Sequence, residues 1–68
     1  MKNLKNLRKL NGLTQEELAR QLGVNQTAVA SWERGASYPT ADKLPEIAKV
    51  LNCKIDDLYT EETVKEAV

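Results

Sequence analysis

The stretch from Thr14 to Gly35 restricts the fold of this chain more than any other part of the sequence. It reads TQEELARQLGVNQTAVASWERG, and Gly23 divides it into two short segments. Thr14 and Glu17 have the spacing of a capping box, which stabilises the start of a helix by about 1 kcal/mol. Gly23 and Gly35 are typical helix ends, because glycine takes positive φ without strain. The stretch therefore predicts two short helices joined by a tight turn.

Each of the two predicted helices has one apolar side. Leu18, Ala19 and Leu22 share a side of the first helix, whereas Val29 and Trp32 share a side of the second. The other side of the second helix and its predicted N-cap carry small or amide side chains suited to base edges: Asn25, Gln26, Thr27, Ala30 and Ser31. A small residue such as Ala19 lets two helices cross closely. The pattern favours a helix-turn-helix that binds DNA.

The segment before this stretch predicts a further helix. Leu4, Leu7 and Leu10 repeat every third residue with polar residues between them, as in an amphipathic helix. Asn11-Gly12 is expected to end that helix, and Leu13 follows as a core residue.

The segment after Gly35 predicts two more short helices. One carries an apolar side formed by Leu44, Ile47, Ala48 and Leu51. It begins either near Asp42, with Pro45 harmless in the first turn, or at Thr40, with a slight bend at Pro45. The last predicted helix covers residues 55–59, and its aspartates lie favourably near its N-terminus. The fold class expected is all-α, with about five short helices.

Length and charge set further bounds. The 68 residues predict one domain over residues 1–60 and a tail over 61–68 that is frayed or a short helix capped by Thr60. The net charge is zero, which is unusual for a DNA-binding chain. The charge is unevenly distributed, since residues 1–34 carry six cations and three anions and residues 35–68 carry four cations and seven anions. Binding follows the local field, so a DNA-binding surface in the first half remains compatible with the sequence.

Several function classes are disfavoured. The chain has no histidine, no glycine-rich phosphate loop and a single cysteine, Cys53, so we expect no enzyme, no cofactor and no metal site. Cys53 is interpreted as a buried apolar residue and not as a redox sensor. We see no signal peptide, membrane span or small-molecule site, and therefore expect a cytoplasmic protein.

The sequence from Leu4 to Tyr59 resembles the Cro/repressor-type helix-turn-helix regulators, also called the XRE family. The resemblance rests on LRKLNGLTQEELARQLGVNQTAVASWERG, on Pro39, and on the segments LPEIAKVL and IDDLY. It implies a compact five-helix domain of the lambda-repressor type. In that family the second helix of the pair, the recognition helix, lies in the major groove with its first residues against base edges.

The resemblance assigns roles to individual residues. It implies base readout by four residues of the recognition helix: Gln26, Thr27, Ala30 and Ser31. It implies phosphate contacts at the helix starts and in the following loop: Thr14, Gln15, Asn25, Arg34, Ser37 and Tyr38. Arg8 and Glu33 match a partly buried ion pair that fixes helix orientation in several members. Lys9 and Arg20 are weaker candidates for phosphate contacts, and solvated surface charge is the favoured interpretation for both.

The function expected is that of a regulator, most simply a repressor, which binds palindromic double-stranded DNA as a homodimer; activation remains open. The dimer interface would use apolar residues near the C-terminus: Ile55, Leu58, Tyr59 and Val64. For Ile55 and Leu58, core filling is the favoured alternative. The competing interpretation is an interaction module or antitoxin of the same fold that acts mainly through a protein partner.

Overall fold

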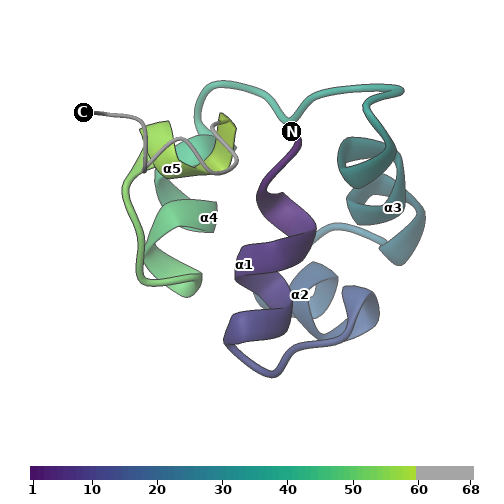
Figure 1. The fold of residues 1–68 in the computed structure, drawn as a ribbon. Helices are drawn as coiled ribbons and strands as arrows, with labels where there is room; N and C mark the ends of the chain where they lie inside the picture. The colour runs from purple at the N-terminus through teal and green to yellow at the C-terminus, as the bar shows by residue number, and fades with distance from the viewer. Residues whose placement is uncertain (60–68) are drawn as a thin grey trace.

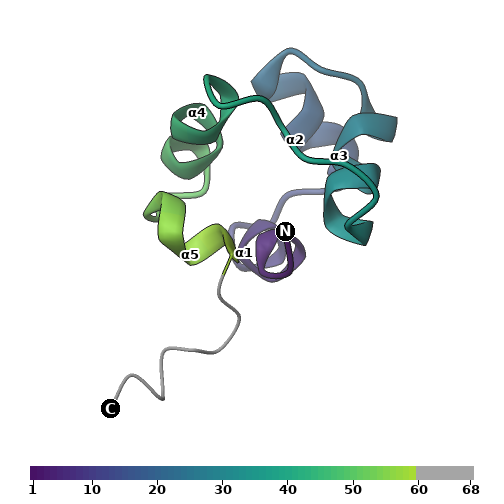
Figure 2. The same cartoon turned by 90° about the horizontal axis from the view of Figure 1, so that it is seen from above.

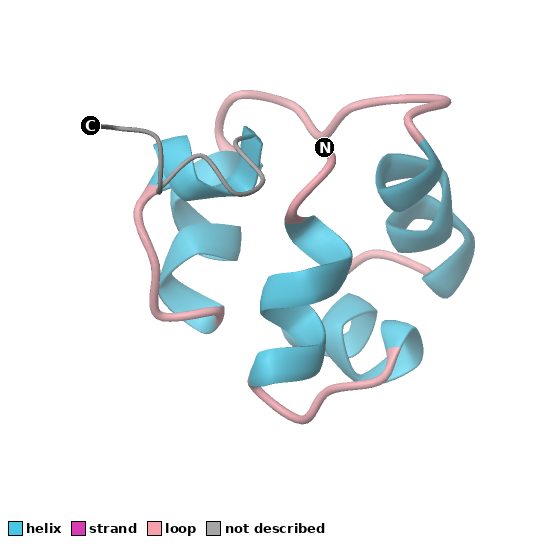
Figure 3. Ribbon diagram, in the orientation of Figure 1, coloured by secondary structure: helices cyan, strands magenta, loops and turns pink. Residues whose placement is uncertain are grey.

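The computed structural model describes residues 1–59, and within that range it contains helices and loops but no strand (Figure 3). The helices are α1 (Leu4–Leu10), α2 (Gln15–Leu22), α3 (Gln26–Arg34), α4 (Lys43–Val50) and α5 (Ile55–Tyr59) (Figure 1). The all-α class with five helices is therefore confirmed. The predictions for the tail, including the Thr60 cap and a dimer contact by Val64, lie outside the described residues.

The helices surround one apolar core, with α1 between α3 on one side and the α4–α5 pair on the other (Figures 1 and 2). All five helices contribute buried side chains, together with the first residue of the chain and the residue that follows α4: Met1, Leu4, Leu18, Ala19, Leu22, Val29, Trp32, Ile47, Leu51 and Leu58. The apolar sides predicted for α2 and α3 are therefore correct. They pack against each other, and Ala19 is buried as expected for a close crossing.

Both ends of α2 have the predicted chemistry. The Thr14 hydroxyl accepts the Glu17 N–H at 3.0 Å, and the Glu17 carboxylate accepts the Thr14 N–H at 2.9 Å. Gly23 ends α2 with φ +74°, in the left-handed region where a side chain would be strained. The Val24 N–H then donates to the Ala19 carbonyl at 3.0 Å, which closes the end of α2. The conformation of Gly23 and the Val24 bond set the direction in which the chain leaves α2 toward α3.

The leucine repeat predicted the buried side of α1 only in part. Leu4 is fully buried and Leu7 packs against the core, but Leu10 is 80% exposed. Steps of three residues fall short of a full helical turn, so the third leucine rotates off the buried side. One turn after Leu4, the inward position is occupied by Arg8, which is buried.

The second half of the chain resolves the alternatives for α4. The helix begins at Lys43, so Pro45 lies in its first turn, where a missing N–H removes no helical bond. Asp42 is the N-cap residue, but its side chain makes no capping bond and instead accepts from the Thr40 hydroxyl at 2.7 Å. In α5, the Asp57 carboxylate accepts the Lys54 N–H at 3.0 Å, consistent with an acidic helix start.

Two polar contacts bind the start of the chain to distant helices. The Met1 ammonium group donates to the Trp32 carbonyl at 3.2 Å, and the Asn3 side chain donates to the Asp57 carbonyl at 2.8 Å. The first residues therefore connect α3 with α5, and both helices are held against α1.

Candidate nucleic-acid interface

The starts of α2 and α3 form one surface, which we call the recognition face. It consists of six residues from the two helices and the α2 cap: Thr14, Gln15, Gln26, Thr27, Ala30 and Ser31. Gln26 and Thr27 are exposed, whereas Ala30 and Ser31 are half-buried. The buried side of α3, with Val29 and Trp32, holds this surface outward. The structure thus places all four residues predicted for base readout on α3, away from the core.

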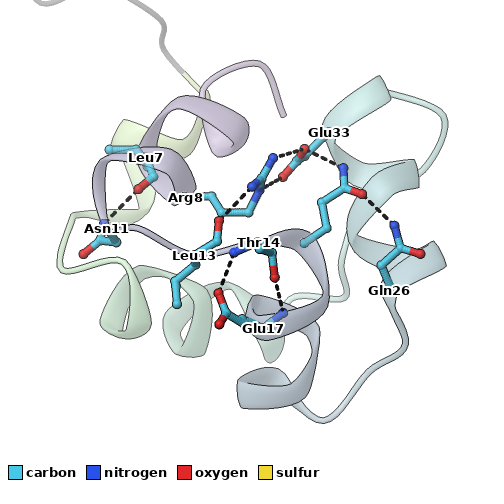
Figure 4. Close-up of polar contacts among 9 residues, drawn as sticks. Leu7, Arg8, Asn11, Leu13, Thr14, Glu17, Gln26 and Glu33 are labelled. Carbon is cyan, nitrogen blue, oxygen red and sulfur yellow. Dashed lines mark hydrogen bonds and ion pairs between the residues drawn. The ribbon is translucent and has the colours of Figure 1, made fainter.

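A chain of hydrogen bonds connects the first residue of α3 to α1 (Figure 4). The Gln26 amide donates to the Gln15 oxygen at 2.6 Å, and the Gln15 amide donates to Glu33 at 2.9 Å. Glu33 also accepts two bonds from Arg8, at 2.6 and 3.2 Å, and Arg8 donates further to the Leu13 carbonyl at 2.8 Å. We call this chain the polar relay. It was not foreseen, because no sequence spacing indicates that Gln15 lies between Gln26 and Glu33.

The Arg8–Glu33 ion pair expected from the resemblance is present. Its side chains are only 9% and 5% exposed. A buried carboxylate without a partner would be costly, and here both of its oxygens accept hydrogen bonds. The pair joins α1 to the last turn of α3.

The recognition helix is also linked to the loop that follows it. The hydroxyls of Ser31 and Ser37 lie 2.7 Å apart, within hydrogen-bond distance. Gly35 ends α3 with φ +85°, and the Ala36 N–H donates to the Ser31 carbonyl at 3.0 Å. Among the residues predicted for phosphate contact, this turn brings Ser37 to the helix, while Arg34 and Tyr38 are exposed.

An open groove of about 670 Å³ lies between the end of α1 and the starts of α2 and α3. Thr14, Gln15, Gln26 and Lys9 are among its lining residues. The Thr14 N–H is occupied by the capping box, but within residues 1–59 the N–H groups of Gln15 and Glu16 have no acceptor. Unpaired N–H groups at a helix start favour an anion, since they carry the positive end of the helix dipole.

Asn25 differs in one respect from the sequence prediction. It is the N-cap residue of α3, but its side chain makes no capping hydrogen bond. It is exposed beside Gln26, in a shallow groove that it shares with Arg20. Arg20 pairs with Glu16 at 3.7 Å on the surface of α2, so its charge is partly compensated.

Residues 1–59 contain no group of histidine, cysteine or acidic side chains arranged to hold a metal ion. Burial raises the pKa of the Cys53 thiol above its ordinary value, and the nearby Asp57 carboxylate adds to this effect. None of the helices described is long and apolar enough to cross a bilayer.

The fold is that of a helix-turn-helix domain. Its recognition face carries side chains suited to base edges, and the start of α2 carries N–H groups that are unpaired within the described residues and suited to phosphates. The family model for helix-turn-helix proteins (HTH_3) matches residues 4–58. This chain belongs to that family.

Relatives and solved structures agree with this assignment. The HTH-type transcriptional activator BcrR of Enterococcus faecalis is 44% identical over 59 residues, which is 87% of this chain and 29% of BcrR. The chain therefore spans less than a third of that relative. The P22 c2 repressor in complex with a synthetic operator has a TM-score of 0.79 and 30% identity, covering 84% of this chain and 86% of the repressor chain. The biofilm regulator SinR in complex with DNA has a TM-score of 0.77 and 28% identity, covering 87% and 95%.

Proposed function

We propose that this chain is a transcriptional regulator that binds double-stranded DNA through the recognition face. The observation that carries the proposal is the position of Gln26. It is exposed at the first turn of α3, and the polar relay holds its amide in a defined orientation. A glutamine amide can pair with the N6 and N7 positions of adenine, and each such bidentate pair discriminates by about 1–3 kcal/mol.

The neighbouring residues have distinct roles in this proposal. Thr27 and Ser31 contact bases beside the one contacted by Gln26, and Ala30 offers a methyl group to thymine. Backbone phosphates are contacted by groups at the helix starts and in the loop after α3: Thr14, Gln15, Asn25, Arg34, Ser37 and Tyr38. Such contacts set the register of the protein on the duplex without reading its sequence.

The proposal includes a homodimer on a palindrome, with two recognition helices one helical turn of DNA apart. The contact surface is on α5, where Ile55 is 39% and Tyr59 44% exposed. Core filling was favoured for both Leu58 and Ile55, and the two outcomes differ. Leu58 is fully buried, which confirms core filling and excludes it from a partner contact, whereas Ile55 is exposed, so core filling was wrong for it. A chain with zero net charge gains most from pairing, because two weak phosphate surfaces then act on one duplex.

Whether the dimer represses or activates transcription depends on where it binds relative to a promoter. Repression by occluding the promoter is the simplest mechanism for a domain of this size. Named relatives and neighbours include both an activator, BcrR, and a repressor, P22 c2. The site of action in this proposal is the cytoplasm, where operator DNA is found.

Selection of bound sequences from random duplex DNA, at two salt concentrations, tests the proposal. We expect enrichment of a palindrome with half-sites about ten base pairs apart. Gln26→Ala should weaken binding and remove the preference at one base pair of each half-site. The matched control is Gln21→Ala, which removes an exposed glutamine of α2 that lies outside the recognition face. Enrichment that is identical for wild type and Gln26→Ala would refute the readout assignment.

A second candidate is an interaction module that acts mainly through a protein partner. The zero net charge and the exposed Ile55 and Tyr59 favour it. Analytical ultracentrifugation separates this candidate from the first. A homodimer that Tyr59→Lys converts to a monomer supports the DNA-binding dimer, whereas a monomer at every concentration, with and without the selected DNA, contradicts it.

A further inference from the structure

A smaller groove between α1 and α3 contains a cation that the proposed function leaves without a role. The groove has a volume of about 280 Å³ and is lined by residues of three helices: Lys5, Gln15, Ala30, Glu33 and Arg34. Lys5 comes from α1, a helix in which it was not predicted to contact a base or a phosphate. Its position opposite Arg34 becomes apparent only once α1 and α3 are packed together.

The charge balance of this groove is positive. Glu33 is its one acidic lining residue, and both carboxylate oxygens already accept hydrogen bonds from Arg8 and Gln15. Its charge is therefore compensated from the buried side. Lys5 and Arg34 are exposed, and neither forms an ion pair within residues 1–59. Two uncompensated cations thus face one concave surface.

The groove is continuous with the recognition face, because Gln15 and Ala30 belong to both. An anion bound here would lie next to the residues that are proposed to meet bases. In a duplex, the anion found beside a base edge is a phosphodiester of the backbone. Arginine presents a planar fork of donors to a phosphate, and lysine adds a compact point charge.

We propose that Lys5 and Arg34 together bind one backbone phosphate of the DNA, at the flank of α3. This inference rests on the proposed function and adds α1 to the DNA-binding surface. The contact supplies affinity without sequence information, because phosphates are the same at every base pair. It also gives two of the six cations in residues 1–34 a direct contact with DNA, which matters because the chain has no net positive charge to attract DNA.

The test compares Lys5→Gln and Arg34→Gln with Lys49→Gln, which removes an exposed charge on α4 that lines no part of this groove. Binding to the selected DNA is measured over a range of salt concentrations. Loss of the whole phosphate contact should make the slope of log K against log salt shallower by about 0.9 per chain. We expect this change for the double variant Lys5→Gln, Arg34→Gln, a part of it for each single variant, unchanged base preference in all three, and no change for Lys49→Gln. A slope for Lys5→Gln equal to that of Lys49→Gln would overturn the proposal.

A second measurement locates the phosphate. Single phosphates of the operator are replaced by uncharged methylphosphonates. One replacement should weaken wild-type binding but leave binding by the double variant Lys5→Gln, Arg34→Gln unchanged, because the double variant has lost both cations that contact that phosphate. If every replacement affects the two proteins equally, the proposal is wrong.

Two further outcomes are distinguishable. Inorganic phosphate that shifts the NMR signals of Lys5 and Arg34, combined with DNA binding that is insensitive to Lys5→Gln, would indicate a free-anion site and would also overturn the proposal. Failure of the proposed function looks different, since wild type itself would then enrich no sequence and show no salt-dependent binding.

Discussion

The guanidinium of Arg8 binds the carboxylate of Glu33 through two hydrogen bonds, 2.6 Å from Nε to Oε2 and 3.2 Å from Nη2 to Oε1. The two residues are 25 positions apart in the sequence and join the first helix to the third. Because both side chains are almost fully buried, the pair acts as an internal brace and not as a surface ion pair.

Glu33→Ala should lower the free energy of unfolding by about 3–5 kcal/mol, because it leaves the Arg8 charge buried without its partner. Urea denaturation followed by Trp32 fluorescence measures the loss. Glu16→Ala, which removes an exposed carboxylate paired with Arg20, is the control and should cost less than about 0.5 kcal/mol. The double variant Arg8→Met, Glu33→Leu should recover most of the stability, since an apolar pair of similar volume needs no charge compensation. Equal losses for Glu33→Ala and Glu16→Ala would contradict the brace.

Thr14→Ala should destabilise the domain by about 1 kcal/mol, because the Glu17 N–H loses its acceptor and the capping box is broken. Thr14→Ser keeps the hydroxyl and should retain most of the stability. Thr27→Ala is the matched control, since Thr27 is an exposed threonine in the first turn of α3, and it should change stability by less than about 0.5 kcal/mol. Thermal unfolding by circular dichroism compares the three variants, and similar midpoints for Thr14→Ala and Thr27→Ala would refute the cap.

Leu4→Ala and Leu10→Ala should differ sharply in their effect on the free energy of unfolding, although both shorten a leucine of α1. Leu4 is fully buried, so its truncation leaves a cavity and should cost about 2–5 kcal/mol. Leu10 is 80% exposed, and its truncation should change stability by no more than about 0.5 kcal/mol. Chemical denaturation of the two variants measures both values. A large loss of stability for Leu10→Ala would contradict the exposed position of this side chain.

The Cys53 thiol should react slowly with iodoacetamide near neutral pH. Burial raises its pKa in the folded protein, which keeps the nucleophilic thiolate scarce. The unfolded chain then releases its thiol proton at a lower pH than the folded one. The contribution of Cys53 to stability is therefore complete below the unfolded pKa and lost as the pH rises through the folded pKa. Alkylation rates against pH, for the folded protein and for the protein in urea, test this shift. An inflection at the same pH in both states would contradict it.

Local sequence chemistry was sufficient to predict the five helices and the ends of α2 and α3, whereas it left two alternatives for the start of α4. Thr14, Gly23 and Gly35 act through their own backbone neighbourhood, so their roles depend little on the rest of the fold. The α2–α3 pair and the buried sides of Leu18, Val29 and Trp32 followed from helical periodicity. Periodicity was less informative for α1, where a buried arginine replaces the expected leucine on the inward side.

The contacts between helices could not be predicted from spacing. Gln15 was assigned to a phosphate and Gln26 to a base, and no pattern in the sequence indicated their mutual hydrogen bond. The groove shared by Lys5 and Arg34 likewise depends on how α1 rotates against α3. The Arg8–Glu33 contact was expected only because the chain resembles a known family. Long-range polar contacts of this kind arise from packing angles, which local sequence does not encode.

The donors and acceptors of the polar relay have a fixed order. A carboxylate can only accept, so Glu33 requires the NH₂ group of Gln15 and turns the oxygen of that amide toward Gln26. Gln26 must then use one N–H for Gln15, which leaves its other N–H and its carbonyl oxygen without a partner within residues 1–59. That remaining donor and acceptor match the edge of adenine. In the proposed DNA complex, the buried acid at position 33 thus constrains which base the side chain of Gln26 can pair with.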